Sequence, residues 1–144
     1  FDIHGCQLID ACAGSGSLGL EALSRGAKRA VFCEWDRDAL LVLKKNIQKL
    51  GFDHQAKILS GDITTVQTWH APPAQLILCD APYDSGLTTK IIPRLAGLGA
   101  LQSTCIIACE VRHSESVSLP DTFAPLDNRR YGMARLFFFR YQPG

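Results

Sequence analysis

A polar tetrapeptide, Asp80-Ala81-Pro82-Tyr83, follows an apolar run and carries the residue types that group-transfer chemistry on a nucleic-acid base requires. The exocyclic amine of a base is a poor nucleophile, because its lone pair is delocalised into the ring. The Asp80 carboxylate and the Ala81 carbonyl could accept both amine hydrogens and turn the lone pair toward an electrophilic methyl group. Pro82 stiffens the segment, and Tyr83 offers a flat face on which an extruded base could stack.

The same tetrapeptide is also compatible with a plain turn that closes a strand, because Asp, Pro and Tyr are ordinary residues in such turns. Its functional interpretation therefore depends on whether other ligand-binding residues emerge at the same edge of the fold.

A glycine-rich stretch follows Asp10 and joins an apolar run to a helix-like segment. Gly14, Ser15 and Gly16 allow a sharp turn and a close approach of a ligand to the backbone, at the start of a helix with free N–H groups. The stretch also satisfies the glycine pattern of dinucleotide-binding proteins, with Glu34 placed to hold ribose hydroxyls, so a nicotinamide enzyme is an alternative. Glycines that merely tighten a strand-to-helix turn are a third interpretation.

Two acidic residues favour S-adenosylmethionine as the ligand. Asp10 lies four residues before Gly14, where its carboxylate suits an ammonium group and repels a pyrophosphate. Asp62 follows a later apolar run, where it could accept a hydrogen bond from an adenine amine. It is equally suited to capping a short helix, and both roles could hold at once. We therefore expect S-adenosylmethionine as the cofactor and S-adenosylhomocysteine as its product.

Apolar runs rich in β-branched and aromatic residues alternate with helix-like segments, which predicts parallel strands joined by crossover helices. The clearest helix has Asp36 as its N-cap and ends at Gly51. Its apolar stripe comprises Leu40, Leu43, Ile47 and Leu50. The predicted strands cover 7–12, 30–34, 56–60, 75–79 and 104–111, and the other helices cover 17–25, a short segment after 62, and 86–98.

The pattern changes near the C-terminus. Residues 123–129 and 134–141 are strand-like runs separated by a turn at Tyr131-Gly132, too close for a parallel crossover, so they predict an antiparallel hairpin. The predicted fold class is α/β: a doubly wound, Rossmann-like, mostly parallel seven-stranded sheet with a C-terminal antiparallel hairpin, the layout of class I methyltransferases.

That layout brings the candidate residues together. The glycine turn, Glu34 and Asp80 all follow the carboxyl ends of parallel strands, which is where doubly wound sheets bind ligands. Their shared edge favours the ligand-binding interpretation of each.

The composition indicates one domain covering residues 1–144, with 47% hydrophobic residues to form its core. No apolar run approaches the roughly 18 residues needed to cross a bilayer, and no export signal is visible, so we expect a cytoplasmic protein without a membrane partner. The six cysteines lie in or beside apolar runs without metal-ligand spacing, so we expect buried thiols and no metal.

The glycine-rich stretch has a specific counterpart. Residues 8–27, LIDACAGSGSLGLEALSRGA, resemble the ribosomal RNA small-subunit methyltransferase D family. The resemblance continues through Glu34, the tetrapeptide, the strand that ends at Glu110, and Arg130-Tyr131-Gly132, so it covers nearly the whole chain.

The resemblance implies methyl transfer from S-adenosylmethionine to the N2 amine of a guanine in small-subunit (16S) ribosomal RNA, bound to protein in a small-subunit particle. It also implies that Asp10, Gly14 and Gly16 contact the methionine part of the cofactor, Glu34 the ribose and Asp62 the adenine. Trp35 either packs on the adenine face or is a core aromatic. We expect the enzyme to be a monomer.

Two departures from the family pattern matter. The family usually has proline where this chain has Ala81; the acceptor there is a backbone carbonyl, so we expect weaker rigidity rather than lost chemistry. The chain opens at Phe1 and almost at once enters a core strand, so we expect that it lacks a short N-terminal RNA-binding segment.

The net charge of +1 requires that any RNA-binding cations be concentrated. Strand direction places Arg112, Arg129 and Arg130 beside Asp80, where they could contact phosphates, although each is also an ordinary surface charge.

Two other functions are compatible with the sequence. One is adenine-N6 methylation of DNA, because the tetrapeptide chemistry serves either amine. The other is a non-catalytic domain that binds S-adenosylmethionine or a nucleotide and assists a partner. The short chain, without a target-recognition domain, favours ribosomal RNA over DNA.

Overall fold

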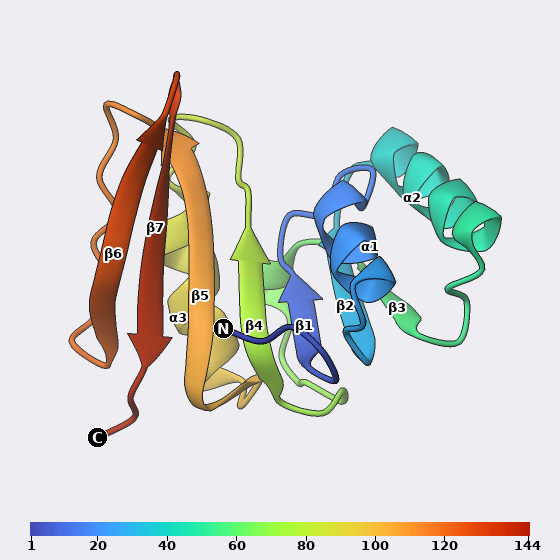
Figure 1. Cartoon of the computed structure of the whole chain (residues 1–144), viewed down its shortest axis with the longest axis horizontal. Helices are drawn as coiled ribbons and strands as arrows, with labels where there is room; N and C mark the ends of the chain where they lie inside the picture. Colours follow the sequence, from blue (N-terminus) through green and yellow to red (C-terminus); the bar gives the residue numbers. More distant parts are fainter.

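The structure, a computed structural model, describes residues 1–144 and is built around one twisted sheet (Figure 1). Its seven strands lie in the order β3-β2-β1-β4-β5-β7-β6. The first five strands pair in parallel, whereas β7 runs antiparallel to both β5 and β6. The predicted fold class is therefore confirmed, including the C-terminal hairpin. The elements are β1 (Gln7–Asp10), α1 (Ser17–Ser24), β2 (Arg29–Glu34), α2 (Arg37–Leu50), β3 (Ala56–Ser60), the 3-10 turn η1 (Ile63–Thr65), β4 (Ala74–Cys79), α3 (Leu87–Gly97), β5 (Leu101–Arg112), β6 (Phe123–Tyr131) and β7 (Ala134–Tyr141).

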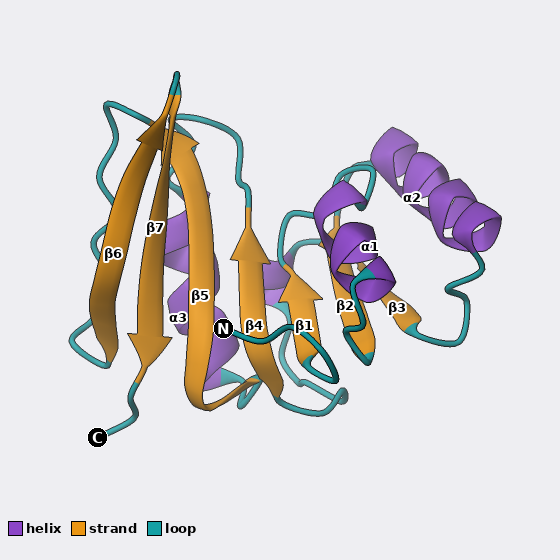
Figure 2. Ribbon diagram, in the orientation of Figure 1, coloured by secondary structure: helices purple, strands orange, loops and turns teal.

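Helices lie on both faces of the sheet (Figure 2). α1 packs over β1 and β2, and α3 packs on the other face against β5 and η1. Strand side chains alternate between the two faces, so Leu8 belongs to the apolar cluster on the α1 side and Ile9 to the cluster on the α3 side. This alternation fixes the strands in register between two cores.

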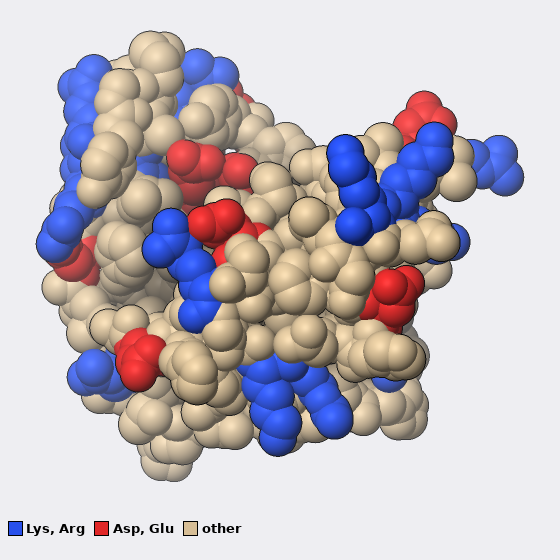
Figure 3. Space-filling model, turned by 45° about the vertical axis from the view of Figure 1, so that its right-hand side comes forward, with Lys and Arg blue, Asp and Glu red and all other residues tan.

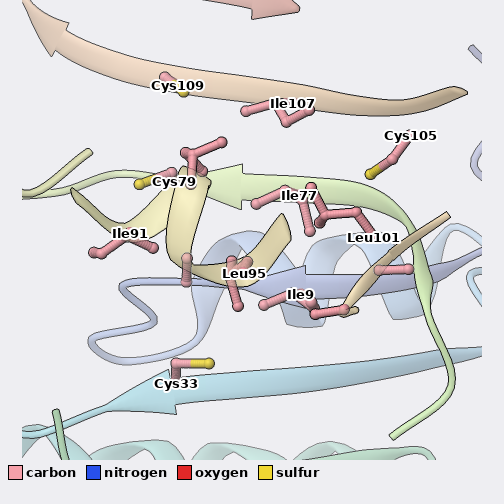
Figure 4. Close-up of a cluster of buried hydrophobic side chains, with 14 of the residues drawn as sticks. Ile9, Cys33, Ile77, Cys79, Ile91, Leu95, Leu101, Cys105, Ile107 and Cys109 are labelled. Atoms are coloured by element: carbon pink, nitrogen blue, oxygen red, sulfur yellow. The ribbon is translucent and has the colours of Figure 1, made fainter. Parts of the chain in front are cut away.

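The α3-side core contains four of the six cysteines, which lie among isoleucine and leucine side chains (Figure 4). All six cysteines are free, and Cys12 is the one that is not fully buried. The predicted role of the thiols as apolar core groups is confirmed for the other five.

Helix α2 begins and ends where the sequence predicts. The Asp36 carboxylate accepts a hydrogen bond from the Ala39 N–H at 2.9 Å, and Gly51 ends the helix in the left-handed conformation. One residue of its predicted stripe is wrong: Leu50 is exposed, because α2 lies at the β3 edge of the sheet and its last turn projects past that edge (Figure 1). None of the helices combines the length and apolar character that spanning a membrane requires.

Most boundaries agree with the prediction to within one residue, and three differences affect the geometry of the sheet edge or the hairpin. β1 ends at Asp10, two residues early, because the chain then turns into the glycine-rich stretch. β5 begins at Leu101, three residues earlier than predicted. Between the pairs Ala74–Leu101 and Leu76–Ile106, β5 has more residues than β4, and they form an irregularity that includes Thr104 with φ of 69°. The β6–β7 turn lies one residue later than predicted, because Tyr131 still pairs with Ala134.

Candidate active site

Polar residues gather at the carboxyl edge of the sheet. Asp10 is the last residue of β1, Glu34 is the last residue of β2, and Asp80 follows β4. These three strands are neighbours and point the same way (Figure 1). Asp10 interacts electrostatically with both of the other carboxylates. The fold thus brings together three acids that lie far apart along the chain.

The glycine turn is fixed by its backbone conformation and by packing. Gly16 has φ of 84°, and a Cβ added there would lie 2.4 Å from Leu43 Cδ1, so both the conformation and the space favour glycine. The Asn46 side chain on α2 donates to the Ser15 carbonyl at 2.9 Å and ties the turn to that helix. Between Gly14 and Leu18, the N–H groups of Ser15, Ser17 and Leu18 make no hydrogen bond within the chain and lie at the start of α1.

Asp10 is buried beneath this turn, with 1% of its surface exposed. Its Oδ2 accepts a hydrogen bond from the Gly19 N–H at 3.1 Å, whereas its Oδ1 is buried without a partner. Burial raises the pKa of the Asp10 carboxyl to about 7, against the lowering effect of the Gly19 hydrogen bond and with a further rise from the charges of Asp80 and Glu34. A buried carboxylate oxygen that lacks a donor is suited to a cationic ligand.

Glu34 is buried and engaged through both carboxylate oxygens. Oε1 accepts from the Gly14 N–H at 2.7 Å, and Oε2 accepts from the N–H groups of Trp35 and Asp36 at 3.0 and 2.9 Å. These bonds hold the carboxylate between the glycine turn and the start of α2. Oε1, which accepts a single hydrogen bond, keeps a lone pair that a ligand hydroxyl could use.

Two residues predicted to contact an adenine lie beside Glu34. Asp62 caps η1, because its Oδ1 accepts from the Thr64 N–H at 2.9 Å and from the Thr64 hydroxyl at 2.7 Å. The predicted capping role is thus confirmed, and the adenine contact stays a prediction. Trp35 is 44% exposed, so its alternative as a core aromatic is wrong. An exposed indole next to Glu34 is available for stacking.

The Asp80-Ala81-Pro82-Tyr83 segment crosses the edge between β4 and α3. Ala81 is buried in the α3-side core, whereas the side chains of Asp80 and Tyr83 are exposed. Ala81 therefore anchors the segment while its neighbours face the edge. The guanidinium carbon of Arg112 lies 4.9 Å from the Tyr83 ring centroid, which covers part of the ring.

Glu110 is a functional candidate to which sequence reasoning assigned no role. Cys79 pairs with Cys109 in the parallel β4–β5 ladder, so the next residues, Asp80 and Glu110, lie side by side. Burial and the hydrogen bond and charge of Asp80 raise the pKa of Glu110. The only sequence signal was its place at the end of a strand, which gains meaning once β5 is known to lie next to β4.

The three predicted RNA-contacting arginines lie near the β6–β7 turn and the end of β5. Arg112 forms an ion pair with Asp84, with Nε 3.2 Å from Oδ2. Arg129 pairs with Asp127, and the Arg130 Nε donates to the Gly132 carbonyl at 3.1 Å. Figure 3 shows basic side chains along the hairpin side of the molecule, with acidic side chains nearer the centre. RNA contact by these arginines stays a prediction.

The largest cavity, about 970 Å³, does not lie at this edge. It lies against the face of β4, β5 and β7, between apolar side chains that include Leu76, Ile106 and Phe138. The candidate site is therefore recognised by its residues and their contacts rather than by cavity volume.

Comparison with known proteins gives consistent matches. A family model described as "Conserved hypothetical protein 95" matches residues 1–140. The chain is 31% identical over 134 residues to ribosomal RNA small subunit methyltransferase D of Haemophilus influenzae, a match that covers 91% of this chain and 69% of that protein. It is 34% identical over 108 residues to the Escherichia coli enzyme of the same name, covering 75% of this chain and 54% of that one. The chain thus spans about half to two thirds of these relatives.

Solved structures agree with the fold. A Haemophilus influenzae protein described as a methylase superposes with a TM-score of 0.87 at 28% identity, covering 98% of this chain and 89% of that one. An RNA methyltransferase from Salinibacter ruber, solved with S-adenosyl-L-homocysteine, superposes with a TM-score of 0.76 at 16% identity, covering 99% and 86%. The second likeness bears on the fold alone.

Proposed function

The chain belongs to the family described as "Conserved hypothetical protein 95" and to the ribosomal RNA small-subunit methyltransferase D enzymes. From this membership we propose that it transfers a methyl group from S-adenosylmethionine to the N2 amine of a guanine in 16S ribosomal RNA. The observation that carries the proposal is the convergence of Asp10, Glu34 and Asp80 at one edge of the sheet. The first two are suited to a cofactor, and the third to a base.

The residues at this edge fit S-adenosylmethionine. The orphaned Oδ1 of Asp10 is suited to the ammonium group of the methionine part, and the free N–H groups at the start of α1 are suited to its carboxylate. Glu34 would accept from the ribose hydroxyls, and Trp35 and Asp62 would bind the adenine. When bound, the cofactor supplies the electrophilic methyl group on its sulfonium.

Asp80 and Ala81 would prepare the base for transfer. The Asp80 carboxylate and the Ala81 carbonyl accept the two hydrogens of the guanine amine, which turns the nitrogen lone pair toward the methyl group. Once methylated, the nitrogen would give up its surplus proton to Asp80. Tyr83 holds the extruded base by stacking, and Pro82 limits the movement of the segment.

Contact with RNA is proposed for the cations around the reaction centre. Arg129 and Arg130 are exposed near the end of β6, on the side of the sheet toward which β4 and β5 also point. Their guanidinium groups are suited to the phosphates that flank the target guanine. Arg112, which is already paired with Asp84, would contact RNA in addition to its role beside Tyr83. We propose that residues 1–144 form one methyltransferase domain, which acts as a monomer on RNA in a small-subunit particle.

Labelled methyl transfer tests the function. The protein is incubated with isotopically labelled S-adenosylmethionine and, separately, small ribosomal subunits, naked 16S RNA and duplex DNA, and the labelled nucleoside is identified. N2-methylguanine in ribosomal RNA is expected. Label in N6-methyladenine of DNA would overturn the proposal, and cofactor binding without label in any substrate would instead support a non-catalytic binding domain.

A further inference from the structure

Four side chains join the loop after β4 to the end of β5. Arg112 lies over the Tyr83 ring and pairs with Asp84 on the same loop. Glu115, just beyond β5, accepts through one oxygen, Oε1, from the Asp84 N–H and from the Arg112 N–H, each at 3.0 Å. Two separate contacts, one to the backbone and one to a side chain, thus tie Asp84 to the end of β5.

The backbone at Asp84 needs such support. Its φ is 60°, in the left-handed region that residues with a Cβ rarely adopt, although Asp tolerates it better than most. This conformation directs the Asp84 N–H toward Glu115. The turn that carries Glu115 is itself closed by a hydrogen bond from the Glu115 N–H to the Arg112 carbonyl at 2.8 Å. The adjacent His113 N–H donates to the Met133 carbonyl at 2.7 Å, which connects this turn to the β6–β7 hairpin.

These contacts are poorly explained by a contribution to folding. The Arg112 and Asp84 side chains are 36% and 64% exposed, and ion pairs at such positions contribute little to stability. What they fix is the orientation of the Tyr83 ring. Arg112 lies over one face of the ring, and Tyr83 keeps 38% of its surface exposed, so a planar group has access to the ring from the uncovered side.

We propose that Glu115 is a positioning residue for the base: through Asp84 and Arg112 it holds the Tyr83 ring in the orientation that receives the extruded guanine. The inference rests on the proposed function, in which Tyr83 stacks on the base. Glu115 contacts neither the base nor the cofactor in this arrangement, so it acts on the base only through Asp84, Arg112 and the Tyr83 ring.

Kinetics of methyl transfer to small ribosomal subunits test the role. Glu115→Ala removes both hydrogen bonds and is expected to lower kcat/KM for RNA about tenfold, the effect of a weakened base stack. Glu115→Gln keeps the Oε1 acceptor and should retain most of the activity, and the dissociation constant of the cofactor should be unchanged in both variants. Glu21→Ala, which removes an exposed carboxylate paired only with Arg25, serves as the matched control without effect.

A double-mutant cycle with Tyr83→Ala separates positioning from a general structural role. If Glu115 acts through Tyr83, Glu115→Ala causes no further loss in the Tyr83→Ala background. Additive losses, or a Glu115→Ala variant as active as the wild type, would overturn the inference.

A second measurement does not depend on activity. The chain has three tyrosines, so fluorotyrosine labelling gives three fluorine NMR signals, of which Tyr83 is assigned with Tyr83→Phe. Glu115→Ala is expected to shift the Tyr83 signal and leave that of Tyr141 in place; an unmoved Tyr83 signal contradicts the inference. If the wild-type protein methylates no RNA but Glu115→Ala still shifts the Tyr83 signal, the proposed function alone is rejected.

Discussion

The two halves of the candidate site are held in different ways. On the glycine-turn side, Asp10 and Glu34 are buried and accept hydrogen bonds from backbone N–H groups. On the base side, Asp80 and Tyr83 are exposed, and the loop is held by side chains that water also reaches. The difference indicates a rigid cofactor half that forms with the core, and a base half whose geometry depends on a few individual contacts.

The two aspartates show what this difference does to one residue type. Asp10 lies in the core, where burial raises its pKa and leaves one oxygen for a cation. Asp80 lies at the surface beside Glu110, where its carboxylate meets substrate and solvent. We therefore expect the aspartate side chain to bind the cofactor at position 10 and to assist methyl transfer at position 80.

Asp80→Ala is expected to have the largest effect and to separate the two halves most clearly. Removing the acceptor of the amine hydrogens should lower kcat by about a hundredfold to a thousandfold, because positioned polar groups contribute that much in comparable sites. The cofactor dissociation constant, measured by calorimetry, should change little. Turnover equal to the wild type would refute the role of Asp80.

Asp10→Asn should have the opposite profile, with a loss in cofactor binding. Replacing the carboxylate weakens its bond to the ammonium group, with an expected affinity loss of about fiftyfold. Because the wild-type Asp10 carboxyl has a pKa of about 7, cofactor affinity should rise as the pH increases from 6 to 7.5, and this dependence should vanish in the variant. Calorimetry at several pH values measures both effects, and an equal pH dependence in the two proteins would contradict them.

The unliganded Asp10→Asn protein should be more stable than the wild type at high pH. The pKa of Asp10 rises from 3.8 to about 7 in the folded protein, so the folded state binds more protons between these values and stability falls as pH rises through that window. At pH 8 the variant should gain up to about 4 kcal/mol in free energy of unfolding, and much less at pH 4. Urea unfolding at the two pH values measures the difference; an equal gain at both would refute the assignment.

The cofactor half could be predicted from sequence because its determinants are local. The strand, the glycine turn and the helix that follow one another around Asp10 and Gly16 are continuous in the chain. Likewise, the Asp36 cap and the Gly51 end of α2 depend only on neighbouring residues. Each local preference agrees with the final fold, so a pattern read along the chain is sufficient.

The base half could be predicted only in part, because its contacts depend on strand order. Glu110 becomes a neighbour of Asp80 only when β5 lies beside β4 in register. Glu115 accepts a hydrogen bond from Asp84, 31 residues earlier in the chain, and no periodic pattern in the sequence predicts that contact. Trp35 was ambiguous for a similar reason, since its exposure depends on how α2 leaves the sheet.

Gly16→Ala tests how rigid the cofactor half is. A Cβ at Gly16 meets Leu43 Cδ1 at 2.4 Å in a left-handed backbone, so strain and overpacking should together lower the free energy of unfolding by about 2–3 kcal/mol. Gly51→Ala is the matched control, because Gly51 has φ of 75° and open space around its Cα, leaving only the backbone cost of about 1 kcal/mol. Equal losses in chemical denaturation would show that the turn is not tightly packed against α2.

Trp35→Ala should give the smallest effect, since it tests a contact at the margin of the rigid half. The exposed indole would stack on the adenine, and its removal should weaken cofactor binding about fivefold, whereas Trp35→Phe retains an aromatic face and most of the affinity. Leu41→Ala, which removes an exposed apolar side chain from α2, serves as the control. Because Trp35 is the tryptophan proposed to stack on the adenine, the change in tryptophan fluorescence on cofactor binding should also disappear in Trp35→Phe. If that change persists, the adenine lies away from Trp35, and the rigid half ends at Glu34.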